Sequence, residues 1–356
     1  MTPRVPLEGP AQLRWELADD APQGALFEPV RREVGTGEFR GMEFLHVEAK
    51  QILNQVKGDP GFLPFRWTVN PYRGCSHACT YCFARPTHTF LGLGAGEDFD
   101  QRVVVKTNAV ERLRAELRPN RWQGELVAMG TNTDPYQRCE GKYRLTRGLI
   151  GALIEAENPF SILTKSTLIL RDLDLLGAAA RRGLVRVSLS VGTVDEAVWR
   201  ATEPGTPPPA RRLRAVRQLN DAGIPTGVLI APILPGVSDA PEQLEAVARA
   251  VVASGATSIG HVVLHLRSPE TRAVYLERLA QTHPEAAERT AQRYVGGGAP
   301  KAERERIAAE LRRAVEAAGG ILGEMEPPAP PPAAVPVELG AATRTPDPAA
   351  QLSFAL

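Results

Sequence analysis

The stretch NPYRGCSHACTYCFAR, residues 70–85, places Cys75, Cys79 and Cys82 within eight residues of one another. A short apolar run at 67–70 leads directly into it, which puts the three cysteines on a loop behind a predicted strand. Three thiolates at C-x3-C-x2-C spacing can converge on one iron–sulfur cubane, because thiolates are the ligands that such clusters require. The fourth iron then has no protein ligand and is open to an external amine and carboxylate.

A structural zinc site is the alternative interpretation of the same loop. Zinc in such sites takes four ligands in a closed tetrahedron, and His77 or His88 would have to supply the fourth. Neither histidine completes a usual zinc spacing. Three of four cysteines packed this closely do not form a disulfide framework, and in a reducing compartment they indicate metal. The chemistry favours the cluster, and a non-catalytic zinc-binding interaction module remains the alternative of another class.

Short apolar runs alternate with amphipathic segments from residue 67 onward, which indicates βαβ units. The predicted strands are 67–70, 125–130, 160–164, 185–191, 226–231 and 258–266, and the predicted helices are 109–117, 146–157, 171–182, 209–222 and 242–253. Gly183, Gly223 and Gly255 each follow a helical run, where a left-handed residue ends a helix. Thr146 is a predicted N-cap, and Pro241 suits a first helical turn. Periodicity alone leaves a doubly wound sheet and a partial parallel barrel open, and both bind ligands at the carboxyl ends of the strands.

Four segments of different composition follow one another along the chain. Residues 1–64 are predicted as an irregular N-terminal arm with a lead-in, whose apolar residues recur at roughly helical spacing: Phe44, Val47, Ile52, Leu53 and Val56. Residues 65–270 form the α/β core, and 271–325, rich in Ala, Glu and Arg, form a helical extension. The Pro- and Ala-rich tail 326–356 is predicted to be disordered, because it cannot bury enough apolar surface to offset its ordering entropy.

Composition and charge exclude several classes of protein. The chain of 356 residues contains 43% hydrophobic and 23% charged residues and has a net charge of +1, as expected of a soluble globular protein without a general attraction to nucleic acid or membrane. The strongest apolar run, 227–234, is far shorter than the ~20 residues of a membrane span and reads as a buried strand. The N-terminus lacks the apolar segment of a signal peptide, so the sequence predicts a cytoplasmic protein without contact to a membrane.

The cysteine loop, with Tyr81 directly before Cys82, resembles the motif of the radical S-adenosylmethionine (SAM) superfamily. The resemblance implies a partial (β/α)6 barrel of the TIM type, with the motif after its first strand. It also implies that Cys75, Cys79 and Cys82 bind a [4Fe–4S] cluster and that SAM chelates the fourth iron. One-electron reduction then cleaves SAM to a 5′-deoxyadenosyl radical, which abstracts hydrogen from the substrate.

Several further segments are similar to the branch of the superfamily that contains spore photoproduct lyase, a DNA repair enzyme. They are NPYRG at 70–74, GTNTDPY at 130–136, TKS at 164–166, RDLD at 171–174, EPGT at 203–206 and APILPG at 231–236. The resemblance covers about residues 65–270 and neither terminus. It implies a nucleic-acid substrate and a one-electron reductant such as flavodoxin or ferredoxin. Radical modification of a protein or a tRNA is the alternative within the same chemistry.

The resemblance also implies which residues bind SAM. The loop Thr131, Asn132, Thr133 and Asp134 follows the second core strand, where the family binds the SAM amino group, and hydroxyls with a carboxylate suit an ammonium. An ordinary Asx turn before a proline is the alternative for this loop. Lys165 and Ser190, at or near the ends of the next two strands, match residues that contact the SAM carboxylate in the lyase branch, whereas a strand-end lysine is otherwise a solvated surface charge.

Two further segments carry side chains whose role the sequence leaves open. His261, Val263, His265 and Arg267 share one strand face by period-two spacing, and a pair of buried, hydrogen-bonded histidines is the preferred interpretation. The helix with Arg211, Arg212, Arg214 and Arg217 is either a phosphate-binding or a solvated face.

Cys139 is the remaining cysteine and the one candidate catalytic residue outside the loop. Spore photoproduct lyase uses a cysteine as hydrogen-atom donor at the end of the second strand, where Thr131 stands here. Cys139 lies eight residues later, so a plain free thiol is the alternative, and the departure argues against direct thymine-dimer repair.

The last six residues, Gln351 to Leu356, are similar to a degenerate form of the peptide with which bacterial DNA enzymes bind the sliding clamp. Two apolar anchors on a flexible Pro- and Ala-rich tether can dock into a preformed groove. The tail therefore predicts a sliding clamp as a partner.

Overall fold

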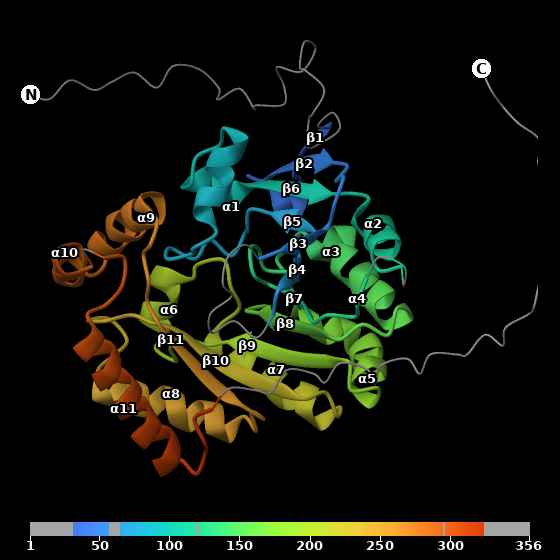
Figure 1. Ribbon diagram of the computed structural model, residues 1–356. Coiled ribbons are helices and arrows are strands. Elements are labelled where there is room, and N and C mark those ends of the chain that lie inside the picture. The colour runs from blue at the N-terminus through green and yellow to red at the C-terminus, as the bar shows by residue number, and fades with distance from the viewer. Residues whose placement is uncertain (1–30, 57–64, 119, 121, 295, 324–356) are drawn as a thin grey trace, which may run out of the picture.

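A seven-stranded sheet forms the centre of the computed structural model, which describes residues 31–56, 65–118, 120, 122–294 and 296–323. Its strands are β3 (Leu53–Gln55), β4 (Trp67–Val69), β7 (Val127–Met129), β8 (Phe160–Thr164), β9 (Val185–Ser190), β10 (Thr226–Ile233) and β11 (Ile259–Val263). The order is β11-β10-β9-β8-β7-β4-β3, and all neighbours are parallel except the edge strand β3. The parallel strands fan out in an open arc, so the predicted partial (β/α)6 barrel is confirmed (Figure 1).

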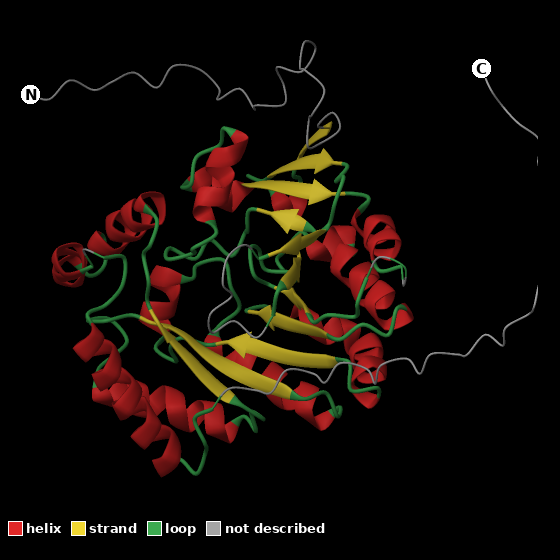
Figure 2. Ribbon diagram, in the orientation of Figure 1, coloured by secondary structure: helices red, strands yellow, loops and turns green. Residues whose placement is uncertain are grey.

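Helices cover the outer face of this arc (Figure 2). They are α2 (Ala109–Glu116), α4 (Leu145–Glu155), α5 (Leu173–Arg181), α7 (Pro209–Asp221) and α8 (Pro241–Ala253), close to the predicted bounds. Apolar strand residues such as Val187 and Ile230 are fully buried with the apolar faces of these helices in one core. Burying apolar side chains on both faces of the strands is what stabilises a parallel sheet of this kind.

Most of the predicted helix boundaries are confirmed. Gly183, Gly223 and Gly255 have φ values of +68°, +74° and +75°, as the ends of three helices require. Pro241 stands in the first turn of α8. The predicted N-cap at Thr146 is wrong: α4 begins at Leu145, and the buried Thr146 hydroxyl donates to the Pro135 carbonyl at 2.5 Å. The threonine stabilises the preceding loop instead of the end of its own helix.

A second, four-stranded sheet lies beside the barrel, in the order β1-β2-β6-β5. Its strands are β1 (Arg31–Val34), β2 (Glu43–Val47), β5 (Tyr72–Arg73) and β6 (Arg102–Lys106). The predicted helical lead-in is wrong, since Phe44 and Val47 lie in β2 and Leu53 in β3. Two strands separated by a turn produced an accidental helical spacing, and pairing of β2 with the valine-rich β6 decided the outcome. Because β5 leads into the cysteine loop, this sheet supports that loop from one side.

Shorter elements complete the connections. They are η2 (Gly37–Phe39), η3 (Arg85–Leu91), η4 (Thr167–Asp172), α1 (Glu97–Gln101), α3 (Glu140–Tyr143) and α6 (Glu196–Thr202). The predicted helical extension consists of α9 (Pro269–Ala280), α10 (Pro284–Arg293) and α11 (Lys301–Ala317). α11 packs on α8, whereas Tyr275 and Leu279 of α9 share an apolar cluster with Cys79 and Tyr81.

Two predictions concern residues outside the described part of the chain. The tail 326–356, with the peptide Gln351 to Leu356, and residues 1–30 of the N-terminal arm are not among the described residues. Among those that are described, no helix combines the length and the apolar character of a membrane span.

Candidate active site at the carboxyl edge of the sheet

A cavity of about 230 Å³ opens where the parallel strands end. It brings together every predicted cluster and SAM residue: Cys75, Cys79, Tyr81, Cys82, Thr131, Asn132, Thr133, Asp134, Lys165 and Ser190. Phe83, Leu229, Pro232, Leu264 and His265 add a largely apolar wall. Residues far apart in sequence meet here because the carboxyl ends of parallel strands lie along one edge of the sheet.

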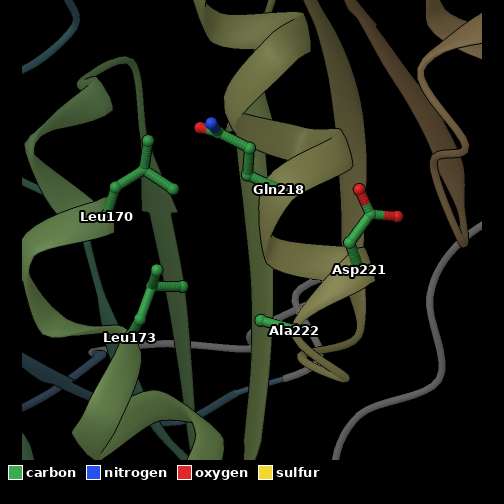
Figure 3. A pocket seen from close by; sticks show the side chains of 5 residues that line it. All are labelled: Leu170, Leu173, Gln218, Asp221 and Ala222. Carbon is green, nitrogen blue, oxygen red and sulfur yellow. The ribbon is translucent and has the colours of Figure 1, made fainter.

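A second cavity, of about 450 Å³, lies on the outside of the barrel. Figure 3 shows Leu170 and Leu173 on one side, and Gln218 and Asp221 of α7 with Ala222 directly after that helix on the other. It contains none of the predicted site residues. Throughout the described segments, no three His, Cys, Asp or Glu side chains meet at a single-ion position.

Consecutive tight turns shape the cysteine loop. Ala78 N donates to Cys75 O at 3.2 Å, and Cys82 N donates to Cys79 O at 3.3 Å. Gly74 enters the loop with a φ of +82°, and a Cβ at this position would lie 2.8 Å from the His88 ring. Only glycine combines this backbone angle with this close approach. The turns direct all three thiols into the cavity.

Two arginines that the sequence analysis missed hold the loop from behind. Arg85 is fully buried and donates to Cys79 O from Nε at 3.1 Å and from Nη2 at 2.8 Å. Its charge is paired with Asp100 at 2.8 Å, and Asp100 also pairs with Arg278 of α9. Arg278 donates to Ala78 O at 3.3 Å. Arg85 lies within the cysteine motif, but its burial could not be predicted from the sequence. Nothing in the sequence indicated a role for Arg278.

The three thiols lie in surroundings that disfavour free thiolates. Burial raises the pKa of Cys75 well above its usual value, and Asp134 and the two other cysteines add to the effect. Burial likewise raises the pKa of Cys82, and that of Cys79 to about 12. Thiolates at this place therefore need a bound cation to stabilise them, and iron held by cysteine sulfur is such a group. The donor set fits an iron–sulfur cluster.

The Thr131–Asp134 loop divides into residues that shape it and residues left for a ligand. The Asp134 carboxylate accepts from the backbone N–H groups of Tyr136 and Lys165, both at 2.8 Å, and from the Thr164 hydroxyl at 2.7 Å. His77 Nδ1 lies 3.3 Å from the same carboxylate. Burial alone would raise the pKa of Asp134, but His77 and these hydrogen bonds lower it. The bond to Tyr136 N is the Asx turn that the sequence analysis kept as its alternative.

Thr133 is also engaged within the protein. Its hydroxyl donates to Gly74 O at 2.7 Å and accepts from the Gln137 amide at 2.8 Å. Thr131 accepts from Asn70 Nδ2 at 3.4 Å, and the Asn132 backbone donates to the same amide at 3.2 Å. The Thr131 hydroxyl and the Asn132 side chain thus retain the most capacity toward the cavity.

Lys165 is not a solvated surface charge. Its side chain is 15% exposed, and Nζ donates to Ser190 Oγ at 2.7 Å. Ser190 Oγ in turn donates to Ala231 O at 2.7 Å. The ammonium lies 5.7 Å from the centre of the Tyr81 ring and 3.8 Å from the carboxylate of Glu203. Lys165 and Ser190 therefore form one polar corner of the cavity.

Glu203 and Arg212 lie behind this corner. The sequence analysis gave Glu203 no role and did not distinguish Arg212 from the other arginines of its helix. Arg212, 1% exposed, pairs with Glu203 and donates to Ser190 O at 2.9 Å. Arg211, Arg214 and Arg217 of the same helix are exposed, so the solvated-face interpretation holds for these three alone. Glu203 belongs to the EPGT motif and could have been noticed there. No sequence pattern distinguishes Arg212 from the other arginines of its helix.

The predicted common face of His261, Val263, His265 and Arg267 is wrong. β11 ends at Val263, so the period-two alternation does not extend to His265 and Arg267. His265 lines the cavity, whereas His261 lies close enough to Arg312 of α11 for that charge to add to the lowering of its pKa by burial. The predicted hydrogen-bonded histidine pair is wrong as well, since within the described residues His265 Nδ1 is buried without a partner.

Cys139 lies away from the cavity. The thiol is fully buried in an apolar cluster with Phe44 and Tyr72, and burial raises its pKa well above the usual value. The chain turns into α3 directly after it, which directs the side chain toward β5 and β6. This geometry leaves Cys139 without access to a ligand in the cavity.

Comparison with known proteins gives the fold and the site a common context. The model of the radical SAM superfamily matches residues 69–251. An uncharacterized protein of Mycobacterium tuberculosis is 47% identical over 266 residues, which cover 75% of this chain and 78% of the relative. An uncharacterized protein of Methanocaldococcus jannaschii is 30% identical over 198 residues, which cover 56% of this chain and 70% of the relative.

Solved structures show the same fold at lower identity. Spore photoproduct lyase complexed with dinucleoside spore photoproduct has a TM-score of 0.55 and 18% identity, with 78% of this chain and 81% of that chain covered. A variant of that lyase with bound AdoMet and the dinucleoside has a TM-score of 0.54 and 19% identity, covering 77% of this chain and 79% of that one. The match of the family model, together with this barrel and its cysteine-lined cavity, shows that the chain belongs to the radical SAM superfamily and is a radical SAM enzyme.

Proposed function

We propose that Cys75, Cys79 and Cys82 bind a [4Fe–4S] cluster and that SAM binds in the cavity beside it. The observation that carries this proposal is that all three thiols and the polar corner of Lys165 and Ser190 line the same cavity. When bound, the cluster supplies the electron that cleaves SAM to a 5′-deoxyadenosyl radical, which abstracts hydrogen from the substrate. The family assignment leaves the zinc-binding interaction module without support.

The protein's own residues bind and orient SAM and exclude water. The Lys165 ammonium binds the SAM carboxylate by a charge-assisted hydrogen bond, and Ser190 Oγ, which accepts a hydrogen bond from Lys165 Nζ, holds that ammonium in position. The Thr131 hydroxyl and the Asn132 side chain bind the SAM ammonium, while Thr133 and Asp134 hold their loop in place. Tyr81 contributes a wall beside the lysine. The protein thus aims a reactive species that the cofactor generates.

We further propose a nucleic acid as the substrate class. A structural neighbour binds a dinucleoside photoproduct, and Phe83 at the cavity is 58% exposed, which offers an aromatic face for a base to stack on. Direct thymine-dimer repair by the lyase's hydrogen-donor scheme has no support from Cys139, which is buried elsewhere. Radical modification of a protein, or of a tRNA instead of DNA, is the alternative that the experiment below must distinguish.

Two partners belong to the proposal. A one-electron reductant such as flavodoxin or ferredoxin supplies the electron, and a sliding clamp binds the tail peptide Gln351 to Leu356. A pull-down with clamp in which deletion of residues 351–356 changes nothing rejects the second partner.

The experiment that tests the function uses anaerobically purified protein. We expect SAM to yield 5′-deoxyadenosine on reduction with dithionite, and a variant with Cys75, Cys79 and Cys82 changed to alanine to yield none. Substrate candidates are then offered in deuterated form: oligonucleotides with and without ultraviolet damage, tRNA, and a protein extract. Deuterium in 5′-deoxyadenosine identifies the substrate class, and deuterium transfer from protein alone contradicts the nucleic-acid proposal.

A further inference from the structure

Three charged side chains lie together at the polar corner of the cavity: the partly exposed Lys165 and the buried Glu203 and Arg212. Lys165 stands just past β8, Glu203 follows α6, and Arg212 lies in α7. Glu203 is 5% and Arg212 is 1% exposed. Arg212 binds the Glu203 carboxylate and donates to Pro207 O at 2.8 Å and to Thr206 Oγ1 at 2.6 Å. The ion pair of Glu203 and Arg212 is therefore buried and is not a salt bridge on the protein surface.

Glu203 joins two parts of the cavity that belong to different segments of the chain. Its carboxylate accepts a hydrogen bond from the Tyr81 hydroxyl, in the cysteine loop, and lies 3.8 Å from Lys165 Nζ. The backbone on either side of it is also tied to the cysteine loop, since Thr80 N donates to Thr202 O at 2.9 Å. Glu203 thus contacts the cysteine loop and the polar corner at the same time.

The segment after Glu203 approaches the cysteine loop as closely as two backbones can. Gly205 N donates to His77 O at 3.0 Å. A Cβ on Gly205 would lie 2.1 Å from Ser76 O, so no other residue fits without moving the backbone. These contacts fix the position of Glu203 relative to the three cysteines.

The charges of Lys165, Glu203 and Arg212 do not cancel. Two cations face one carboxylate, and the negative charge of Asp134 is engaged by His77 and three hydrogen bonds. Burial alone would raise the pKa of Glu203, but Arg212 and Lys165 lower it, so the carboxylate is ionised at neutral pH. A net positive charge in this wall attracts anions, both the thiolate-ligated cluster that the proposed function places in the same cavity and the carboxylate of a ligand. The Lys165 end, which lines the cavity, is where such an anion can reach it.

We propose that Glu203 is a positioning residue that holds the Lys165 ammonium and the Tyr81 phenol as one unit, with Arg212 as its charge partner. This inference rests on the proposed function, because the anion that the unit recognises is the SAM carboxylate. Glu203 itself contacts no ligand. It sets the distance between the carboxylate site and the cysteine loop, and so the place of SAM relative to the cluster.

Positioning and simple charge compensation predict opposite results. If Glu203 only neutralised charge, Glu203→Gln would add a net positive charge near the site and strengthen binding of a carboxylate. If Glu203 positions Lys165, the same change frees the ammonium and weakens that binding. The two roles are thus separated by the direction of one affinity change.

The test measures binding to anaerobically reconstituted, oxidised protein by titration calorimetry. The probes are SAM and decarboxylated SAM, which lacks the carboxylate. For Glu203→Gln we expect roughly tenfold weaker binding of SAM, the size of a lost hydrogen bond to a charged group, and less than about twofold change for decarboxylated SAM. Glu196→Gln, an exposed glutamate on α6 paired with Arg200, is the matched control and should bind both probes as wild type does.

The outcomes separate this inference from the proposed function. Wild type that fails to bind SAM, or that binds both probes equally, contradicts the proposed function. Wild type that prefers SAM, with Glu203→Gln showing the same preference or binding SAM more tightly, overturns the role of Glu203. Where Glu203→Gln loses its iron, Arg212→Lys decides: it keeps the charge but not the paired geometry. A lowered preference for SAM is expected there, and an unchanged preference overturns the inference.

Discussion

Arg278 in α9 lies 2.7 Å from Asp100 in α1, and this contact joins the helical extension to the cysteine loop. Asp100 also holds the fully buried Arg85, whose guanidinium binds the Cys79 carbonyl. α9 lies beyond residues 69–251, the region that the superfamily model matches. The part of the chain outside the shared domain is therefore a structural support of the three cysteines.

Removing this support should weaken iron retention. We expect Arg278→Gln to lower the free energy of unfolding by about 1 kcal/mol and to speed iron loss to a chelator roughly fivefold, because one charge-assisted contact is lost. Arg289→Gln, in an exposed pair on α10, is the control and should lose iron as wild type does. Equal rates in both variants contradict the supporting role of α9.

Asp134 and Asn132 should respond to substitution in different ways. Asp134→Asn keeps Oδ1 but replaces Oδ2, which accepts from Lys165 N and faces His77, by an NH2 donor. We therefore expect about 2 kcal/mol lower stability in thermal or urea unfolding. Asn132→Ala should change stability by less than about 0.5 kcal/mol and weaken SAM binding. A stable Asp134→Asn variant, or Asn132→Ala with unchanged SAM affinity, contradicts the division of this loop.

Cys139 is expected to matter for packing and not for chemistry. Cys139→Ala should leave the yield of 5′-deoxyadenosine and the product per SAM cleaved unchanged, because the thiol is enclosed by apolar side chains. The lost sulfur should cost about 1 kcal/mol of stability, as small cavities in cores do. A variant that still cleaves SAM but releases damaged or uncoupled product would restore Cys139 as the hydrogen donor.

His88 should make stability depend on pH. Burial lowers the pKa of His88 from 6.5 to about 4, while Nε2 binds the Arg102 carbonyl at 2.9 Å. The unfolded chain binds a proton at higher pH than the folded one, so this contribution is complete above pH 6.5 and is lost as the pH falls toward 4.

Between pH 7 and pH 5 wild type should lose about 2 kcal/mol through this histidine alone. In His88→Gln, measured by urea unfolding at both values, that part of the loss should be absent. The prediction fails if both proteins lose the same amount over this interval.

The fold of the core followed from sequence because local signals and long-range packing agreed there. Each parallel strand is a short apolar run. The helices α5, α7 and α8 are each followed by a glycine with positive φ, and α7 and α8 begin at a proline. The N-terminal strands were missed because β2 depends on its partner β6, about sixty residues away in sequence, and pairing partners leave no local mark.

Site residues that belong to a sequence motif could be predicted, whereas residues whose role depends on their burial could not. The cysteines were found from their spacing and Lys165 and Ser190 through a resemblance, and all of them line the cavity. The burial of Arg212 was not predicted, because an arginine-rich helix is usually solvated. Successive helix residues point in directions about 100° apart, so Arg212 faces the protein while Arg211 is exposed. The predicted common face of His261 and His265 was wrong because β11 ends at Val263, and no turn residue in the sequence marks that end.

Everything proposed for this enzyme depends on what Cys75, Cys79 and Cys82 hold, and metal analysis of anaerobically reconstituted protein tests that most directly. We predict about four irons per chain in wild type, as for one cubane, and close to none in the variant with all three changed to alanine. Iron retained by that variant, or zinc in place of iron in wild type, would contradict the account.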